Sequence, residues 1–103
     1  MQQFDFVENL NPQTRSRYPF LVVLQHDRIH GLATLVVAPL TPASALPALD
    51  RLHPKAMVGR QSFRVVVEEL AAVRSRTLGQ TVGSLEGERY AIIAAIDLLF
   101  TGI

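Results

Sequence analysis

Cysteine is absent from this chain of 103 residues. The protein can therefore form neither a disulfide framework nor a thiolate metal site. The sequence also lacks any apolar run close to the roughly 20 residues that a membrane-spanning helix needs. Its first residues, Met1 to Phe6, lack the basic and apolar regions of a signal peptide. From these absences we expect a cytoplasmic protein that does not enter a membrane.

Charge is scarce as well. Asp, Glu, Lys and Arg make up 18% of the residues, and the net charge is +1. A balance this close to neutral builds in no strong attraction to nucleic acid or to a membrane surface. Hydrophobic residues make up 49% of the chain. We expect one domain over residues 1–103, with its own core and with some apolar surface shared with another subunit.

The most strongly helical stretch is the last one, residues 90–103. Four apolar residues recur there on one helix face, at Ile92, Ile96, Leu99 and Ile103. Alanines and further large apolar residues fill most other positions, so the predicted helix has almost no polar side. Such a helix is normally buried on more than one side. We therefore expect it to pack on a sheet, to be covered by a second subunit, or to meet a partner at its end.

The predicted helix has signals at both ends. Ser84 is a suitable N-cap, and Glu86 and Glu88 place negative charge in the first turn. Gly102 stands where a C-cap belongs. We interpret residues 78–83 as a glycine-punctuated approach to the helix, without the Lys-Ser/Thr pair of a phosphate-binding loop.

Runs of β-forming residues elsewhere predict antiparallel strands. We expect strands at residues 3–7, 18–25 and 35–38, and a tight hairpin over residues 56–67. The apolar run within the second strand is continuous rather than alternating, which predicts burial on both faces. Gly31 is expected in the turn between the second and third strands, and residues 8–17 are expected to form a polar loop.

Four prolines lie between residues 39 and 54. Because proline lacks a backbone N–H, we expect no long regular element across them. The stretch is interpreted as an ordered surface connection with one helical turn at residues 48–52.

Several residues have types that bind metals or do chemistry. His26, Asp27 and His30 lie close in sequence, but no further ligand is obvious besides the distant His53, so we expect no metal site. Glu68 and Glu69 would point to opposite faces of a strand, which prevents acid/base cooperation and favours a solvated edge. Two arginine pairs are explained as solvated charge, with contact to an anion or an acidic partner as the alternative: Arg15 with Arg17, and Arg74 with Arg76.

Parts of this sequence resemble the CcdB family, the toxins of one class of type II toxin–antitoxin module. The resemblance is carried by Gly59-Arg60-Gln61-Ser62-Phe63-Arg64, by the long last helix, and by the ending Leu99-Phe100-Thr101-Gly102-Ile103. The segment from Tyr18 to Leu40 is similar to the second and third strands of the family. From Leu52 to Ile103 the similarity runs without an apparent gap.

This resemblance implies a mainly β fold with a C-terminal α-helix. The family fold is a small SH3-like antiparallel β-barrel, shared with MazF, that forms a homodimer. Family members bind the A subunit of DNA gyrase, trap the cleaved-DNA complex and serve plasmid maintenance. A cognate CcdA-like antitoxin neutralises them, and they meet DNA only indirectly through it. They carry out no chemistry, so the resemblance implies no catalytic residue, cofactor or metal.

The family contacts gyrase with the end of its last helix and with the connection between strands two and three. Four residues of this chain match that pattern: Ile29, Phe100, Gly102 and Ile103. Three others depart from it. Thr101 stands where the family has Trp, Asp97 where it has Asn, and Arg28 where it has the first of two isoleucines. We expect the loss of the Trp, with a new hydroxyl that needs a partner, to weaken or abolish gyrase poisoning.

Two alternatives remain open. An endoribonuclease toxin of the MazF/Kid kind would share this fold, since fold alone does not fix function. Such an enzyme needs a convergent base, acid and cation, and no spacing in the sequence unites Glu68 and His53 with the arginines. A second alternative is a relative that has lost toxicity and only binds its antitoxin.

Overall fold

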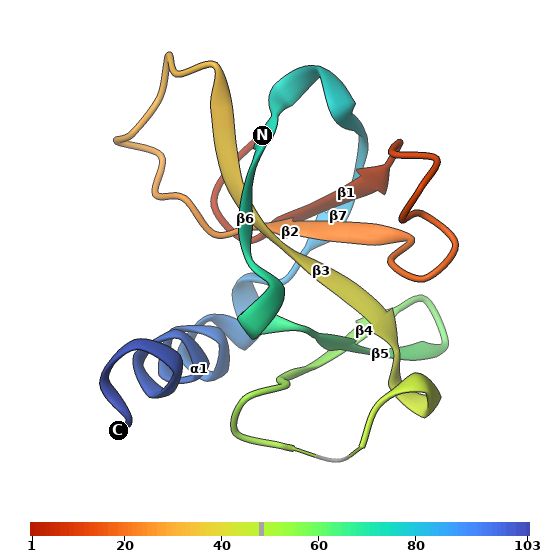
Figure 1. Ribbon diagram of the computed structural model, residues 1–103, viewed down its shortest axis with the longest axis vertical. Coiled ribbons are helices and arrows are strands. Elements are labelled where there is room, and N and C mark those ends of the chain that lie inside the picture. Colours follow the sequence, from red (N-terminus) through yellow and green to blue (C-terminus); the bar gives the residue numbers. More distant parts are fainter. Residues whose placement is uncertain (48) are drawn as a thin grey trace.

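The computed structural model describes residues 1–47 and 49–103. Within them, a seven-stranded antiparallel sheet is followed by one α-helix (Figure 1). The strands are β1 (Asp5–Asn9), β2 (Phe20–Val23), β3 (Thr34–Pro42), β4 (Lys55–Val58), β5 (Gln61–Val65), β6 (Ala71–Arg74) and β7 (Leu78–Ser84), and the helix is α1 (Arg89–Thr101). Four 3₁₀ turns connect them: η1 (Ala43–Ala45), η2 (Val67–Glu69), η3 (Ser75–Thr77) and η4 (Glu86–Glu88).

Strand β3 is the central strand of the sheet, because it pairs with β2, β5 and β6. The order of the strands is β4-β5-β3-β2-β1-β7, and β6 also pairs with β3. On the side away from β2, β6 pairs with residues 34–37 of β3, and β5 pairs with residues 40–42. Because β3 changes its neighbour midway, the sheet divides and curves into half of a barrel, with α1 beside it (Figure 1). The expected fold, mainly β and barrel-like with a C-terminal helix, is confirmed.

Pro39 lies inside β3, so the prediction that no regular element would cross the prolines was wrong at this point. The carbonyl of Pro39 accepts a hydrogen bond from Val66 N at 2.8 Å. In an antiparallel sheet, the N–H and C=O of one residue point toward the same neighbouring strand. The N–H that Pro39 lacks would therefore point away from β2, toward the edge of β3 on which β6 ends and β5 begins. No bond to β2 is lost, although Pro39 stands opposite Leu21 there.

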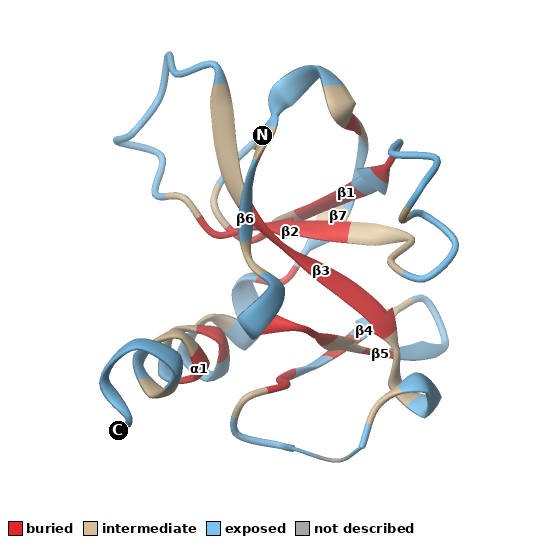
Figure 2. Ribbon diagram, viewed as in Figure 1, coloured by how far each residue is buried: buried red, intermediate tan, exposed pale blue. Residues whose placement is uncertain are grey.

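The core is divided between the two faces of the sheet. The larger cluster lies between the sheet and α1 and includes Phe4, Phe6, Val22, Leu40 and Ile92. The smaller cluster, on the opposite face, contains Val7, Leu21, Val23, Val37 and Leu78. Strand β2 contributes to both clusters, which confirms the predicted burial of both its faces (Figure 2).

Strand β7 pairs with β1, although the sequence indicated only a loop before the helix. Its glycines permit close approach. A Cβ on Gly83 would lie 2.8 Å from Cε1 of Phe6, and one on Gly79 would lie 2.7 Å from Cβ of Glu8. Glycine is thus required by the packing of β1, and it does not mark a break in the strand.

The start of the helix also differs from the prediction. The hydroxyl of Ser84 accepts a bond from Glu86 N at 3.1 Å, but Glu86 and Glu88 form the 3₁₀ turn η4, and α1 begins only at Arg89.

No helix within residues 1–47 and 49–103 is long and apolar enough to cross a membrane.

Two connections follow the prediction more closely. Gly31 adopts positive φ in the turn that the sequence predicted, and Gly59 does so in the turn of the predicted hairpin. The helical turn expected at residues 48–52 begins at Ala48, which lies outside the described residues. From Leu49 the chain makes a hydrogen-bonded turn, in which Leu52 N and His53 N donate to Leu49 O.

Candidate functional site: the end of the last helix

Helix α1 ends in a left-handed glycine. Gly102 has φ 76° and ψ 11°, and its N–H donates to Leu98 O at 3.0 Å. This conformation satisfies a helix-end carbonyl and is readily adopted only by glycine. The predicted C-cap is confirmed, and it turns Ile103 away from the helix axis.

The apolar side chains at this end face solvent. Phe100 is 68% exposed and Ile103 is 82% exposed, whereas Ile92 and Ala95 are fully buried. We call residues 100–103 the C-terminal tip. The sequence grouped Leu99 and Ile103 with Ile92 on one buried face, but within a single chain the sheet covers only the first half of the helix (Figure 2).

A second exposed strip runs along the helix. Tyr90, Ala94, Asp97 and Thr101, spaced for one helix face, are all exposed. Packing on the sheet therefore accounts for one side of α1, the side of Ile92 and Ala95. The other side remains open for a second subunit or a partner.

Thr101 does not present a free hydroxyl. Its Oγ1 donates to the main-chain oxygen of Asp97 at 2.6 Å, one helical turn back. The expectation that this hydroxyl would need a partner at an interface was therefore wrong. The side chain offers its methyl group and a small area, while the carboxylate of Asp97 remains exposed beside it.

The C-terminal tip is also held by a residue distant in sequence. Nη2 of Arg51 donates to the main-chain oxygen of Ile103 at 2.7 Å, across 52 positions of the chain. No local pattern could have revealed this contact, because it depends on how the connection between η1 and β4 passes the helix end.

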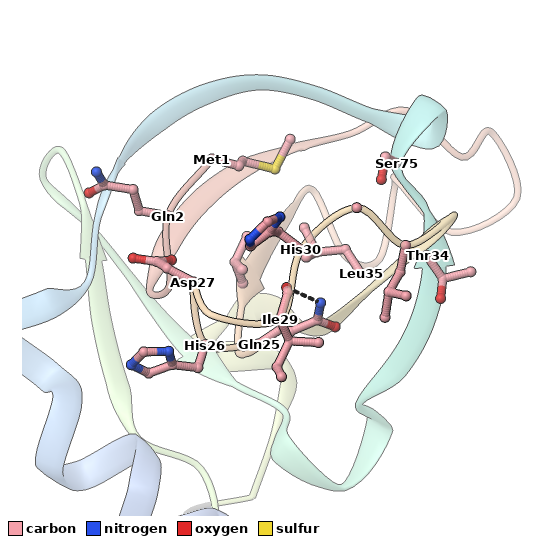
Figure 3. A pocket seen from close by; sticks show the side chains of 13 residues that line it. Met1, Gln2, Gln25, His26, Asp27, Ile29, His30, Thr34, Leu35 and Ser75 are labelled. Atoms are coloured by element: carbon pink, nitrogen blue, oxygen red, sulfur yellow. Dashed lines mark hydrogen bonds between the residues drawn. The ribbon is translucent and has the colours of Figure 1, made fainter.

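The other matching residue, Ile29, lies in the connection between β2 and β3. Its side chain is 53% exposed, and its main-chain oxygen accepts a bond from Gln25 Nε2 at 2.7 Å (Figure 3). Gln25 Oε1 in turn accepts from Val36 N at 3.2 Å. The connection is therefore anchored to the start of β3, and it presents Ile29 beside a surface hollow of ≈ 380 Å³.

The connection and the tip are separate within one chain. In Figure 1 the connection projects at the upper left and the C-terminus lies at the lower left. Arg28 is exposed in the connection, and its backbone N–H donates to Nδ1 of His26 at 3.0 Å. Ile29 and the tip therefore form two patches, which a single target would have to span or two subunits would have to combine.

His26 and Asp27, two of the residues considered as metal ligands in this connection, are engaged in hydrogen bonds. His26 accepts the bond from Arg28, and Oδ1 of Asp27 accepts from Gln3 N at 2.7 Å. Among residues 1–47 and 49–103, no three His, Asp or Glu side chains are grouped so that they could hold a metal ion.

His53 and Glu68, which no sequence spacing united, do meet in the structure. Nε2 of His53 lies 2.9 and 2.8 Å from the two carboxylate oxygens of Glu68. Glu68 lies on η2 and not on the strand edge that was expected. His53 is only 3% exposed, so the pair ties the chain before β4 to η2 and shields the imidazole, while Glu68 remains partly exposed.

A comparison with known protein families identifies a match over nearly the whole chain. The family model described as CcdB protein matches residues 3–102 of the chain. The match covers the strands, α1 and six of the seven positions that the resemblance compared with the gyrase contacts of the family; Ile103 lies just beyond it.

Proposed function

This chain belongs to the CcdB family, and from that premise we propose that it binds the A subunit of DNA gyrase through its C-terminal tip. CcdB proteins are toxins of toxin–antitoxin modules that poison gyrase by binding. The observation that carries the proposal is the exposure of Phe100 and Ile103 around the left-handed Gly102. Large apolar side chains at a helix end are typical of a contact surface and not of a free terminus.

The proposed action requires no chemistry from the toxin. Gyrase itself cleaves DNA, and a protein that binds the cleaved complex more tightly than the free enzyme shifts the population toward that complex. Burying one large apolar side chain contributes about 1.5–3 kcal/mol. Phe100 and Ile103 would supply the apolar centre of such a contact, with Ile29 as an additional patch.

We further propose that this contact is weaker than in family members that carry Trp at the position of Thr101. A Trp buries about 150–250 Å² and is favoured at the centre of interfaces. Thr101 covers much less area, and its hydroxyl is already bonded to Asp97 O. The weakening therefore arises from missing apolar area, with added charge at Arg28 and Asp97.

The proposal includes a homodimer and a cognate CcdA-like antitoxin, as in the family. The exposed strip of α1 that includes Tyr90 and Ala94 supports a second subunit, because a soluble monomer gains nothing from leaving it uncovered. The antitoxin would release gyrase by competing for the toxin, and any contact with DNA would pass through it. A protein that acts on gyrase would work in the cytoplasm, and the proposal includes that location.

The decisive experiment measures binding to purified gyrase A protein and the accumulation of cleaved DNA with whole gyrase. Phe100→Ala should lower both, while Met57→Ala, which truncates an exposed apolar residue on β4, should leave both unchanged. Equal behaviour of the two variants would contradict the assignment of the tip. Binding to antitoxin without any gyrase effect would identify a relative that has lost toxicity.

Incubation with RNA tests the ribonuclease alternative in the same preparation. His53 and Glu68 are the residues that such an activity would need, and His53 is buried. RNA cleavage that disappears in His53→Ala but not in Phe100→Ala would favour the enzyme over the gyrase poison.

A further inference from the structure

We infer that Arg51 is a positioning residue that holds the C-terminal tip in the conformation that its target binds. The inference rests on the proposed function of the tip, but its geometry is independent of the target. Nη2 of Arg51 lies 2.7 Å from the main-chain oxygen of Ile103. Arg51 comes from the connection before β4, and none of the family's contact residues lies in that connection.

The backbone beyond Gly102 lies outside the hydrogen-bond pattern of α1. The last helical bond of the chain is the one from Gly102 N to Leu98 O. Ile103 follows the left-handed turn, and its side chain is almost fully exposed. The bond from Arg51 therefore fixes a part of the tip that the helix alone leaves free to move.

Electrostatics favour the same arrangement. The carbonyl end of a helix carries partial negative charge, which a nearby cation stabilises. The last turn of α1 contains no basic residue. The guanidinium of Arg51 supplies that cation from elsewhere in the chain, and a hydrogen bond from a charged donor is stronger than a neutral one.

Arg51 is itself held on both sides. Nη1 of Arg64 donates to His53 O at 2.9 Å and lies 3.0 Å from Oδ1 of Asp50. The imidazole of His53 is fixed by Glu68 on η2. Asp50 and His53, which flank Arg51, are thus anchored to β5 and η2, so the backbone that carries the Arg51 side chain has a defined position.

A tip that is already ordered loses less entropy when a partner binds it. Ordering one mobile residue at an interface costs about 0.5–1.5 kcal/mol, which corresponds to roughly two- to tenfold in affinity. Arg51 should therefore act on affinity through the order of Gly102 and Ile103 and not through the core.

The test compares Arg51→Ala, Arg51→Lys and the control Arg60→Ala in the full-length protein. Arg60 is an exposed arginine in the turn between β4 and β5, so its removal changes the charge equally. Backbone ¹⁵N order parameters of residues 99–103 report the tip without any target. Affinity for purified gyrase A protein is measured in the wild-type background and in the Thr101→Trp background.

We expect Arg51→Ala to lower the order parameters of Gly102 and Ile103 while those of Ile92 to Ile96 stay unchanged. Affinity for gyrase A protein should fall roughly two- to tenfold, and Arg51→Lys should recover part of both effects. Unchanged order parameters in Arg51→Ala, or a loss of affinity equal to that of Arg60→Ala, would overturn the inference. If neither background binds gyrase A protein, the proposed function fails, and the order parameters alone decide the role of Arg51.

Discussion

Nε2 of His53 lies 2.8 and 2.9 Å from the two carboxylate oxygens of Glu68, and this contact joins the chain before β4 to η2. Because a carboxylate only accepts, Nε2 is the protonated nitrogen of the pair. Nδ1 of His53 is buried and has no partner among the described residues. Glu68 therefore satisfies the one hydrogen bond that this buried imidazole makes through its ring.

Removing that acceptor should destabilise the protein. We expect Glu68→Ala to lower the free energy of unfolding by about 1–3 kcal/mol. The loss should be near the lower value, because water reaches the exposed part of the Glu68 side chain. For a domain of about 100 residues, each kcal/mol lowers Tm by roughly 4–8 °C. Glu69→Ala, which removes the exposed neighbouring carboxylate, is the matched control for thermal unfolding at fixed protein concentration. Equal Tm values for the two variants would show that the pair does not stabilise the fold.

Gly83→Ala should also destabilise the protein, for a steric reason. The new Cβ would lie 2.8 Å from Cε1 and 2.9 Å from Cζ of Phe6, whose ring belongs to the buried core. Displacing such a ring costs about 1–3 kcal/mol. Gly87→Ala meets nothing within 4 Å and should leave chemical denaturation unchanged. A stable Gly83→Ala protein would mean that β1 and β7 adjust more freely than their packing indicates.

Thr101→Trp should strengthen binding to gyrase A protein. Restoring a buried aromatic contact is worth about 2–4 kcal/mol, or roughly 30- to 1000-fold in affinity. Thr101→Val removes the hydroxyl without adding area, and because that hydroxyl bonds only to Asp97 O, we expect little change. Titration calorimetry measures the affinity for gyrase A protein, and growth arrest on expression measures the toxicity. No gain in a correctly folded Thr101→Trp protein would point to another target, and tight binding by the unmodified protein would refute the weakening.

Deleting residues 101–103 should leave a folded homodimer that no longer binds its target. All three residues are exposed, so their loss removes little of the core. Sedimentation should give twice the chain mass for both proteins, and the full-length chain has a mass of 11.4 kDa. Unfolding of the shortened chain would show that the tip is structural, and a monomeric full-length protein would remove the dimer from the proposal.

Local patterns predicted the elements whose neighbours are near in sequence. The hairpin of β4 and β5, the turn at Gly31 and the C-cap at Gly102 all depend on short-range geometry, and all are present. Some features that depend on distant partners were missed. Gly79 and Gly83 look like loop residues until β1 is packed against them, and Pro39 looks like a strand breaker until β3 is seen to change its neighbour.

The candidate site shows the same division. Phe100, Gly102 and Ile103 could be proposed as contact residues because the family ending is contiguous in sequence. The contact of Arg51 with Ile103 and that of His53 with Glu68 join segments that only the folded chain brings together. The hydroxyl of Thr101 was misjudged because its acceptor is the backbone of its own helix, which no interface pattern reveals.

The pairing of β1 with β7 has a consequence for the newly made chain. A ribosome adds about 5–20 residues per second from the N-terminus, so β1 emerges several seconds before β7 and α1. Until β7 and α1 emerge, Phe4 and Phe6 cannot pack with the helix, and Gly83 cannot pair with Phe6. The larger core cluster therefore cannot form. Each copy therefore passes through an interval in which β1 to β6 have been synthesised but it cannot yet display an ordered tip.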